Sequence, residues 1–458
     1  MTRLIFLGGT MKAVIAAAIL IFTCQGMANF NMNKHNIIVK TKKNVSVQAL
    51  GFNSVMMSKQ PIVKGMQLHL LTLNPALNVN TVLKVIRKHP DVAYAQLDHK
   101  VTQRNSPNDP GFNNQWSMEL SQSNYGIDAL SAWTTYGTGG KDILDNNIVV
   151  AVVDGGIEMD HPDLKANMWI NKGEIAGNGI DDDGNGYIDD INGWSGYKNS
   201  GKLESNYHGT HVAGIVGAKG NNSKQVAGVN WDVKIMNVPG SSGNTSVVLR
   251  AYNYILKQKK LWLETNGQKG ANIVSTNSSF GIDFADCNSS NYAAWNDIYN
   301  EMGKYGILSA AATMNRSADV DSRGDVPTGC SSEFIVAVTN TGPDGKRGFA
   351  AFGKNSIDLA APGEDILSTV TGGGVSELSG TSMATPHVAG AIAYLNSIAS
   401  TTLTDLYMND PEAAALEMKN ILLSTVTKRP GLEDETVSGG ILNLNEAAQK
   451  ASNFGLPN

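Results

Sequence analysis

The hydrophobic positions between residues 108 and 445 fall into short, nearly continuous runs that alternate with amphipathic stretches of helical period. Four of these runs predict buried parallel strands, at residues 147–153, 271–275, 306–312 and 334–338. The amphipathic stretches 246–265 and 292–305 predict helices between the strands. Alternating strands and helices of this kind are typical of an α/β fold with a mostly parallel central sheet.

Residues 29–105 follow a different pattern. Strands are predicted at residues 36–40, 66–73 and 92–97, and a helix is predicted at residues 79–89 with Asn80 as its N-cap. The polar segment 103–111 contains proline and glycine and predicts a domain boundary. We therefore expect a small α+β domain over residues 29–105, followed by the α/β domain over residues 106–458.

The N-terminus has the features of a signal peptide. Lys12 precedes an apolar run at residues 13–22, and Gly26 and Ala28 are small residues placed before Asn29. This order predicts a signal peptide over residues 1–28, with Met11 as an alternative start, and a secreted or extracytoplasmic protein. A membrane anchor and a lipoprotein cysteine at Cys24 are the alternatives, but the run is short for a bilayer span. No other stretch is apolar enough to span a membrane after signal removal.

Composition narrows the class of protein. Hydrophobic residues make up 41% of the chain and charged residues 17%, which argues against disorder. The net charge of −5 and the lack of an arginine-rich stripe argue against nucleic acid as a partner. If Cys24 is removed with the signal, Cys287 and Cys330 remain. In an oxidising compartment they predict a disulfide, with two buried free thiols as the alternative.

An aspartate, a histidine and a serine lie at the ends of predicted strands or the beginnings of predicted helices. Asp154 ends a predicted buried strand and is followed by two glycines, and His208 begins a predicted helix rich in small residues. Ser382 lies at a helix N-terminus, where we expect Pro386 in the first turn. Each of the three has an ordinary structural explanation when taken alone, as a turn residue, a helix cap or a core residue.

Together the three residue types supply what nucleophilic hydrolysis needs. A serine hydroxyl is a weak nucleophile until a base removes its proton. Histidine titrates near neutral pH and can be that base, and a buried carboxylate fixes the tautomer of its ring. A helix N-terminus at Ser382 favours negative charge that develops during the reaction.

The segments around Asp154, His208 and Ser382 resemble the three signature motifs of the subtilisin-like serine proteases, or subtilases, and residues 380–386 match nearly completely. The resemblance extends from residue 108 to about residue 445. It implies a three-layer α/β fold and an endopeptidase that cleaves protein or peptide substrates through an acyl-enzyme on Ser382. Residues 29–105 more weakly resemble the family's propeptide, an intramolecular inhibitor removed by self-processing. The alternative is a non-catalytic, calcium-dependent binding protein on the same scaffold.

The resemblance also implies roles around the triad. Asn315 matches the oxyanion asparagine, with Asn277 as a competing candidate. The predicted substrate-binding residues are Ser279, Phe280, Gly281, Gly240, Thr313 and Met314. The substrate would pair with residues 279–281 as an added strand, a mode that tolerates many sequences, so we expect broad specificity. Thr313 and Met314 replace the family's usual Ala-Gly, so the depth and preference of the adjoining pocket do not follow from the resemblance.

A calcium loop is predicted between the motifs of Asp154 and His208. Oxygen ligands recur at Asp181, Asp183, Asn185, and Asp189 or Asp190, with glycine at the sixth position, although Asn192 stands where such a loop normally ends in glutamate. A solvated acidic turn is the alternative. The resemblance implies a second structural calcium site at Asp109, Asp163 and Asn222. We expect Ca²⁺ at one or two structural sites.

Overall fold

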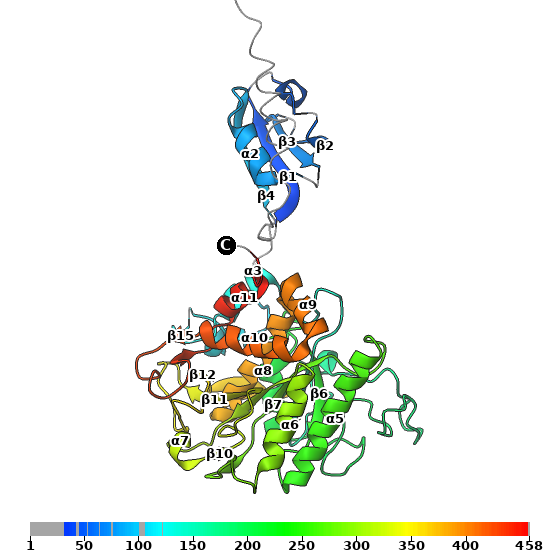
Figure 1. Ribbon diagram of the computed structural model, residues 1–458, viewed down its shortest axis with the longest axis vertical. Coiled ribbons are helices and arrows are strands. Elements are labelled where there is room, and N and C mark those ends of the chain that lie inside the picture. Colours follow the sequence, from blue (N-terminus) through cyan, green and yellow to red (C-terminus); the bar gives the residue numbers. More distant parts are fainter. Residues whose placement is uncertain are drawn as a thin grey trace, which may run out of the picture. The chain divides into compact units, whose positions relative to one another are not determined.

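The computed structural model describes residues 32–42, 45–52, 54–63, 65–74, 77–99, 106–120 and 122–456 (Figure 1). The predicted signal peptide over residues 1–28 and the predicted processing region near Asn105 lie outside the described residues. The chain divides into two compact units between residues 103 and 104, two residues before the predicted domain boundary. No helix within the described ranges combines the length and apolarity that a membrane span requires.

The first unit is a small α+β structure. Its described residues form a four-stranded antiparallel sheet of order β2-β3-β1-β4 with an α-helix, and the elements are β1 (Met32–Thr41), β2 (Met56–Val63), β3 (Leu68–Leu73), α2 (Val79–Arg87) and β4 (Val92–His99). Apolar residues from β1, β3 and α2 form its core, including Ile37, Leu71 and Ile86. Strand β2 was not predicted, because nearly all of its residues are exposed and an edge strand of this kind lacks alternation.

The predicted N-cap of α2 was wrong by two residues. Asn78 has the extended backbone of a cap, and its Oδ1 accepts a hydrogen bond from the amide of Thr81 at 3.0 Å. Asn80 lies inside the helix, because helical backbone already begins at Val79.

The second unit is built on a mostly parallel sheet. Within the described residues its order is β15-β16-β12-β11-β9-β7-β5-β6, and only β15 and β16 pair antiparallel. Its strands are β5 (Val149–Asp154), β6 (Lys234–Pro239), β7 (Ile273–Ser278), β9 (Leu308–Ala312), β11 (Ile335–Thr341), β12 (Leu359–Pro362), β15 (Thr427–Lys428) and β16 (Gly440–Ile441). The predicted strands correspond to β5, β7, β9 and β11, so the predicted α/β fold is confirmed.

Helices and two short ribbons surround this sheet. The helices are α3 (Ala129–Tyr136), α4 (Tyr207–Gly217), α5 (Thr245–Glu264), α6 (Ala293–Lys304), α7 (Val320–Arg323), α8 (Thr381–Ile398), α9 (Thr401–Asn409), α10 (Pro411–Ser424) and α11 (Leu444–Ser452). The ribbons pair β8 (Ile282–Asp283) with β10 (Asp325–Val326), and β13 (Ile366–Val370) with β14 (Gly374–Leu378).

Both faces of the sheet are buried, which explains the continuous apolar runs of its strands. In β5, Val150 and Val152 face a core shared with α4 and α8, whereas Val149, Ala151 and Val153 face a core shared with α5 and α6. The result is the three-layer arrangement visible in Figure 1. Of the predicted catalytic residues, Asp154 is the last residue of β5, and His208 and Ser382 are the second residues of α4 and α8.

Helix α8 corrects one detail of the sequence interpretation. The helix begins at Thr381, so Pro386 is its sixth residue and lies beyond the first turn. Proline has no N–H, and the carbonyl oxygen of Ser382 therefore lacks its usual helical donor four residues later.

Candidate active site

Asp154 and His208 form a hydrogen-bonded pair. The carboxylate of Asp154 ends β5 and is almost fully buried, and both of its oxygens lie 3.0 Å from Nδ1 of His208. Its Oδ1 also accepts a hydrogen bond from the amide of Gly155 at 2.6 Å. Because an ionised carboxylate only accepts hydrogen bonds, Nδ1 carries the proton and the other ring nitrogen, Nε2, is left to act as a base.

Local sequence positions the histidine. Asn206 caps α4, and its Oδ1 accepts hydrogen bonds from the amides of His208 at 2.9 Å and Gly209 at 3.3 Å. A side chain at Gly209 would collide with the carbonyl oxygen of Gly156, which explains the glycine that follows His208. Burial lowers the pKa of His208, but the hydrogen bond and the negative charge of Asp154 outweigh burial and raise that pKa above its usual value.

Ser382 and Asn315 line one cavity at the beginning of α8. The cavity measures about 100 Å³ and is lined by Ser279, Phe280, Gly281, Asp283, Ala312, Thr313, Met314, Asn315, Asp325, Thr381 and Ser382. Oδ1 of Asn315 accepts hydrogen bonds from the main-chain N–H and the hydroxyl of Thr381, at 2.9 and 3.1 Å. These two bonds fix the amide group, so that its NH₂ end is the one left to donate.

Other predicted substrate residues divide into two groups. Five of the six line the cavity together with Ser382: Ser279, Phe280, Gly281, Thr313 and Met314. Gly240 does not line it; its amide donates to the main-chain oxygen of Asp154 at 2.8 Å. The competing oxyanion candidate, Asn277, is buried outside the cavity and donates to the hydroxyl of Ser279 at 3.0 Å.

The two helices that carry His208 and Ser382, α4 and α8, contact each other. The described structure contains no hydrogen bond between these two side chains. Contacts of this kind are often long without substrate and shorten when substrate binds.

Three acids converge in the predicted calcium loop. Within the described residues, one carboxylate oxygen from each of Glu174, Asp183 and Asp190 lies within 4.8 Å of the other two. Asp190 is fully buried, and burial, together with the charge of Asp183, raises the pKa of its carboxyl to about 7 against the opposing effect of several hydrogen bonds. A divalent cation would offset this repulsion, so the donor set fits calcium.

The remaining predicted ligands of this loop have other contacts. Asp181 accepts from the amides of Gly184 and Gly186, both at 2.8 Å, and so shapes the turn. Asp189 likewise accepts from main-chain amides of residues 177 and 179. Asn185 does face the acids, but through its NH₂ group, at 3.1 Å from both Asp183 and Asp190. Its amide would have to turn over before its oxygen could bind a cation.

The residues predicted for the second calcium site lie next to one another. Asp109 accepts hydrogen bonds from the amides of Asn221 at 2.6 Å and Asn222 at 3.1 Å. The side chain of Asn222 donates to Asp163 at 3.0 Å. Burial raises the pKa of Asp109, and the charge of Asp163 adds to that effect. The three predicted residues are therefore neighbours, with two buried carboxylates among them.

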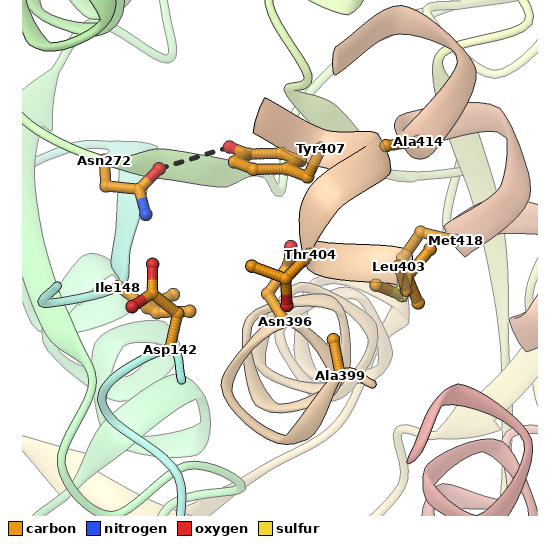
Figure 2. Close-up of a pocket in the computed structure, with 10 residues that line it drawn as sticks. All are labelled: Asp142, Ile148, Asn272, Asn396, Ala399, Leu403, Thr404, Tyr407, Ala414 and Met418. Carbon is orange, nitrogen blue, oxygen red and sulfur yellow. Dashed lines mark hydrogen bonds between the residues drawn. The ribbon is translucent and has the colours of Figure 1, made fainter. Parts of the chain in front are cut away.

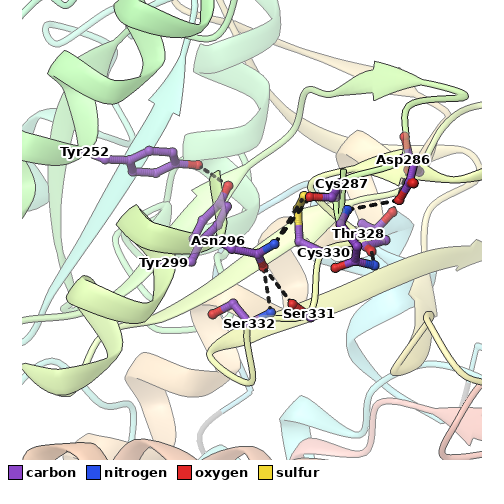
Figure 3. Close-up of a disulfide and its surroundings, with 12 residues drawn as sticks. Tyr252, Asp286, Cys287, Asn296, Tyr299, Thr328, Cys330, Ser331 and Ser332 are labelled. Carbon is purple, nitrogen blue, oxygen red and sulfur yellow. Dashed lines mark hydrogen bonds between the residues drawn. A yellow bond between two sulfur atoms is a disulfide. The ribbon is translucent and has the colours of Figure 1, made fainter. Parts of the chain in front are cut away.

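The structure joins Cys287 and Cys330 in a disulfide (Figure 3). Asn296 of α6 holds both flanking segments, since it donates to the carbonyl oxygen of Cys287 at 3.4 Å and accepts from the amide of Ser332 at 2.9 Å. The bond anchors the chain that follows β10 to the chain that follows β8.

Another cavity, shown in Figure 2, lies between α9, α10 and the start of β7. Polar groups of Asp142, Asn272, Asn396 and Tyr407 line it, and the hydroxyl of Tyr407 donates to Asn272 at 3.2 Å. Its volume of about 10 Å³ holds at most one water molecule, which excludes it as a substrate site.

Sequence reasoning missed three acids at these sites. Asp283 and Asp325 line the cavity beside Ser382, and Glu174 joins the acids of the loop. None of them belongs to a recognisable motif. Asp325 reaches the cavity because β10 pairs with β8, in a register that places Asp325 opposite Asp283. Short pairings of this kind leave no periodic signal in the sequence.

Comparison with known proteins identifies the family of this chain. The model of the subtilase family matches residues 145–440. The extracellular basic protease of Dichelobacter nodosus is 29% identical over 396 residues, which are 82% of this chain and 61% of that protein. The extracellular protease of Xanthomonas campestris pv. campestris is 29% identical over 430 residues, covering 89% of this chain and 67% of that protein.

A solved structure is similar as well. A protease from Pseudoalteromonas arctica PAMC 21717 superposes with a TM-score of 0.54 at 27% sequence identity, covering 76% of this chain and all of that one. The family match spans well over half of the sequence and includes Asp154, His208 and Ser382. The chain therefore belongs to the subtilase family.

Proposed function

We propose that this protein is a secreted serine endopeptidase in which Ser382 is the nucleophile, His208 the general base and Asp154 the group that orients the base. The observation that carries the proposal is the hydrogen-bonded pair of Asp154 and His208, with Nδ1 3.0 Å from the carboxylate. In the neutral form of His208 the proton sits on Nδ1, next to the carboxylate, so Nε2 is free to remove the proton of the serine hydroxyl.

The reaction follows from these positions. Oγ of Ser382 attacks the peptide carbonyl carbon while Nε2 of His208 takes its proton, and the carbonyl oxygen becomes an oxyanion. The main-chain N–H of Ser382 and the NH₂ of Asn315 donate to that oxygen. His208 then returns the proton to the leaving amine, which leaves an acyl-enzyme. Water, deprotonated by the same histidine, releases the second product and restores the serine.

We further propose that the first unit is an inhibitory propeptide that the enzyme removes itself. Support comes from its separate compact fold and from the polar segment that separates it from the second unit. Secretion is supported by the features of residues 1–28 and by the extracellular proteases to which the chain is similar.

Calcium is proposed as a structural ligand of the second unit. Glu174, Asp183 and Asp190 would hold one ion, and Asp109, Asp163 and Asn222 are the candidates for another. The ion would supply positive charge that offsets the repulsion among buried carboxylates. No step of peptide hydrolysis needs it.

The test compares wild type with Ser382→Ala, expressed in a protease-free system and measured by intact mass and by casein hydrolysis. We expect wild type to shorten to near residue 108 and to cleave casein, whereas the variant stays unprocessed and inactive. Supplied proteolysis of the precursor separates a processing defect from a catalytic one. A wild-type protein that cleaves nothing after removal of the first unit, yet still binds calcium, would favour the non-catalytic binding protein instead.

A further inference from the structure

The cavity beside Ser382 contains a buried acid that the catalytic steps above do not use. Asp325 stands at the start of β10 and its residue is only 1% exposed, yet it contributes to the lining of the cavity. Its Oδ2 accepts three hydrogen bonds, from the hydroxyls of Thr328 at 2.5 Å and Thr313 at 3.0 Å and from the amide of Met314 at 3.2 Å. All three bonds go to one oxygen, which holds the carboxylate in a fixed orientation.

The donors around Asp325 are two hydroxyl groups and a main-chain amide, all neutral, so none of them balances its negative charge. Among the described residues, no lysine, arginine or histidine forms an ion pair with it. The neighbouring Asp283 differs, because its carboxylate forms an ion pair with Nε of Arg316 at 3.0 Å. Of the two acids that line the cavity, Asp325 is therefore the one that presents an uncompensated negative charge.

Electrostatics within the cavity agree with this assignment. Burial raises the pKa of Asp325 to about 6, the hydrogen bonds from Thr328 and Thr313 oppose the rise, and the charge of Asp283 on the paired strand adds to it. The carboxyl is thus mostly ionised at neutral pH. A cation that entered the cavity would stabilise the ionised form further.

The rest of the lining suits a side chain with an apolar stem and a charged end. Phe280 and Met314 contribute apolar surface, whereas Asp325 and the threonine hydroxyl groups supply a polar end. Lysine and arginine place a flexible apolar stem along such surface and keep the charged group at its tip. Gly281 permits close packing at one wall, since a side chain there would collide with the carbonyl oxygen of Val326.

We propose that Asp325 makes this protease selective for lysine or arginine immediately before the cleaved bond. The inference rests on the proposed function, because the cavity serves this residue only if Ser382 attacks the bond that follows it. An acid inside the pocket beside a catalytic serine sets that preference by pairing with the cationic end of the substrate side chain. Main-chain pairing with residues 279–281 still tolerates many sequences elsewhere in the substrate.

The disulfide helps to keep the acid in place. Thr328, which donates to Asp325, lies two residues before Cys330, and Figure 3 shows it beside the bridge to Cys287. Gly324, just before Asp325, is also held closely, because a side chain there would lie 2.5 Å from the carbonyl oxygen of Ala285. Both ends of β10 are therefore fixed against the segment that follows β8.

The experiment measures kcat/KM of the mature enzyme on peptides that differ only before the cleaved bond, with arginine, lysine, glutamine, leucine or phenylalanine there. For wild type at pH 8 we expect arginine and lysine to exceed glutamine and phenylalanine by at least about tenfold. Asp325→Asn keeps the size of the side chain and removes the charge. It should reduce kcat/KM for the cationic peptides by at least about tenfold and leave the leucine and phenylalanine peptides within about threefold.

The matched control makes the same aspartate-to-asparagine change at a residue outside the cavity. Asp297 is an exposed residue of α6, and Asp297→Asn should leave the ratio between arginine and phenylalanine peptides unchanged. Either of two results would overturn the proposal: a wild-type enzyme that prefers leucine or phenylalanine, or an Asp325→Asn variant that keeps the preference for arginine and lysine. The first result does not depend on the variant, so the proposal remains testable even if Asp325→Asn folds poorly. Failure to cleave any of the peptides would instead count against the proposed peptidase function.

Discussion

The hydroxyl of Ser279 donates a hydrogen bond of 3.0 Å to the main-chain carbonyl oxygen of Ser382. That oxygen has no helical partner because Pro386, four residues later in α8, lacks an N–H. Ser279 thus takes the place of the missing donor, and it receives a hydrogen bond in turn from Asn277 at 3.0 Å. The segment proposed to bind substrate is therefore tied directly to the backbone of the proposed nucleophile.

Replacing this donor should destabilise the protein. Ser279→Ala removes the donor to a partly buried carbonyl oxygen, and we expect a loss of about 1–3 kcal/mol in the free energy of unfolding. In a Pro386→Ala background the new amide of residue 386 can donate to the same oxygen, so Ser279→Ala should cost less. Denaturant unfolding of the two single variants and the double variant measures this coupling. Equal costs in both backgrounds would mean that the two residues do not share this role.

The pH dependence of activity should reflect the pair of Asp154 and His208. Neutral His208 is the proposed base, and Asp154 raises its pKa, so kcat/KM should increase with pH through a midpoint above about 6.5. Asp154→Asn removes that charge, which should move the midpoint to lower pH and lower kcat by roughly 10⁴-fold. Asp160→Asn is the control, since the side chain of Asp160 is 91% exposed. An unmoved midpoint in Asp154→Asn would contradict the assignment.

The same pair also makes the stability of the fold depend on pH: its contribution to stability falls as the pH rises, whereas activity rises. The pKa of His208 is higher in the folded protein than in the unfolded chain, so the folded state binds its proton more tightly. The contribution to stability is complete below a pH of about 6.5 and is lost as the pH rises through the raised pKa. Unfolding of the inactive Ser382→Ala variant at several pH values, with and without Asp154→Asn, measures this contribution without self-digestion.

Calcium removal should lower stability. An ion that binds only the folded protein contributes about 2.7 kcal/mol when its concentration is 100 times its dissociation constant. We expect excess chelator to lower the melting temperature of Ser382→Ala, and added calcium to restore it. Combining Glu174→Gln with Asp183→Asn should remove the part of this response that the first site contributes, because both residues belong to the group of three acids. Asp163→Asn tests the second site separately, and a chelator without effect on any variant would exclude both.

The disulfide should contribute measurably to folding. It joins residues 43 positions apart, and loss of a bridge of this kind costs about 2–4 kcal/mol. Cys287→Ser combined with Cys330→Ser should show that loss in denaturant unfolding, and reduction of the wild type should give a similar value. Detection of two free thiols in the native protein would contradict the pairing.

The strands of the central sheet could be predicted because each is buried on both faces. Continuous apolar runs such as that of β5 follow directly from this burial. The edge strand β2 could not be predicted, since its side chains are mostly exposed and show no alternation of buried and exposed positions. The position of Pro386 was misjudged for a related reason: a helix boundary depends on one or two residues of backbone geometry that composition does not fix.

The site was predictable only where local motifs carry the chemistry. Asp154, His208 and Ser382 each stand at the end of a strand or the start of a helix, which sequence patterns can locate. Glu174 precedes the predicted calcium loop, whereas the expected glutamate would have stood at the position of Asn192. Asp325 becomes part of the cavity only through the pairing of β10 with β8. Contacts of this kind arise from tertiary structure and leave no local signal.

The most direct test of the central claim is covalent labelling by a fluorophosphonate, which reacts with an activated serine. The wild-type protein, freed of its first unit, is labelled in calcium-containing buffer at pH 8, digested and mapped by mass spectrometry. We predict a single adduct on Ser382, absent from Ser382→Ala and strongly reduced in His208→Ala. A processed and folded protein that takes up no label, or takes it up at another residue, would contradict the assignment of Ser382 as the nucleophile.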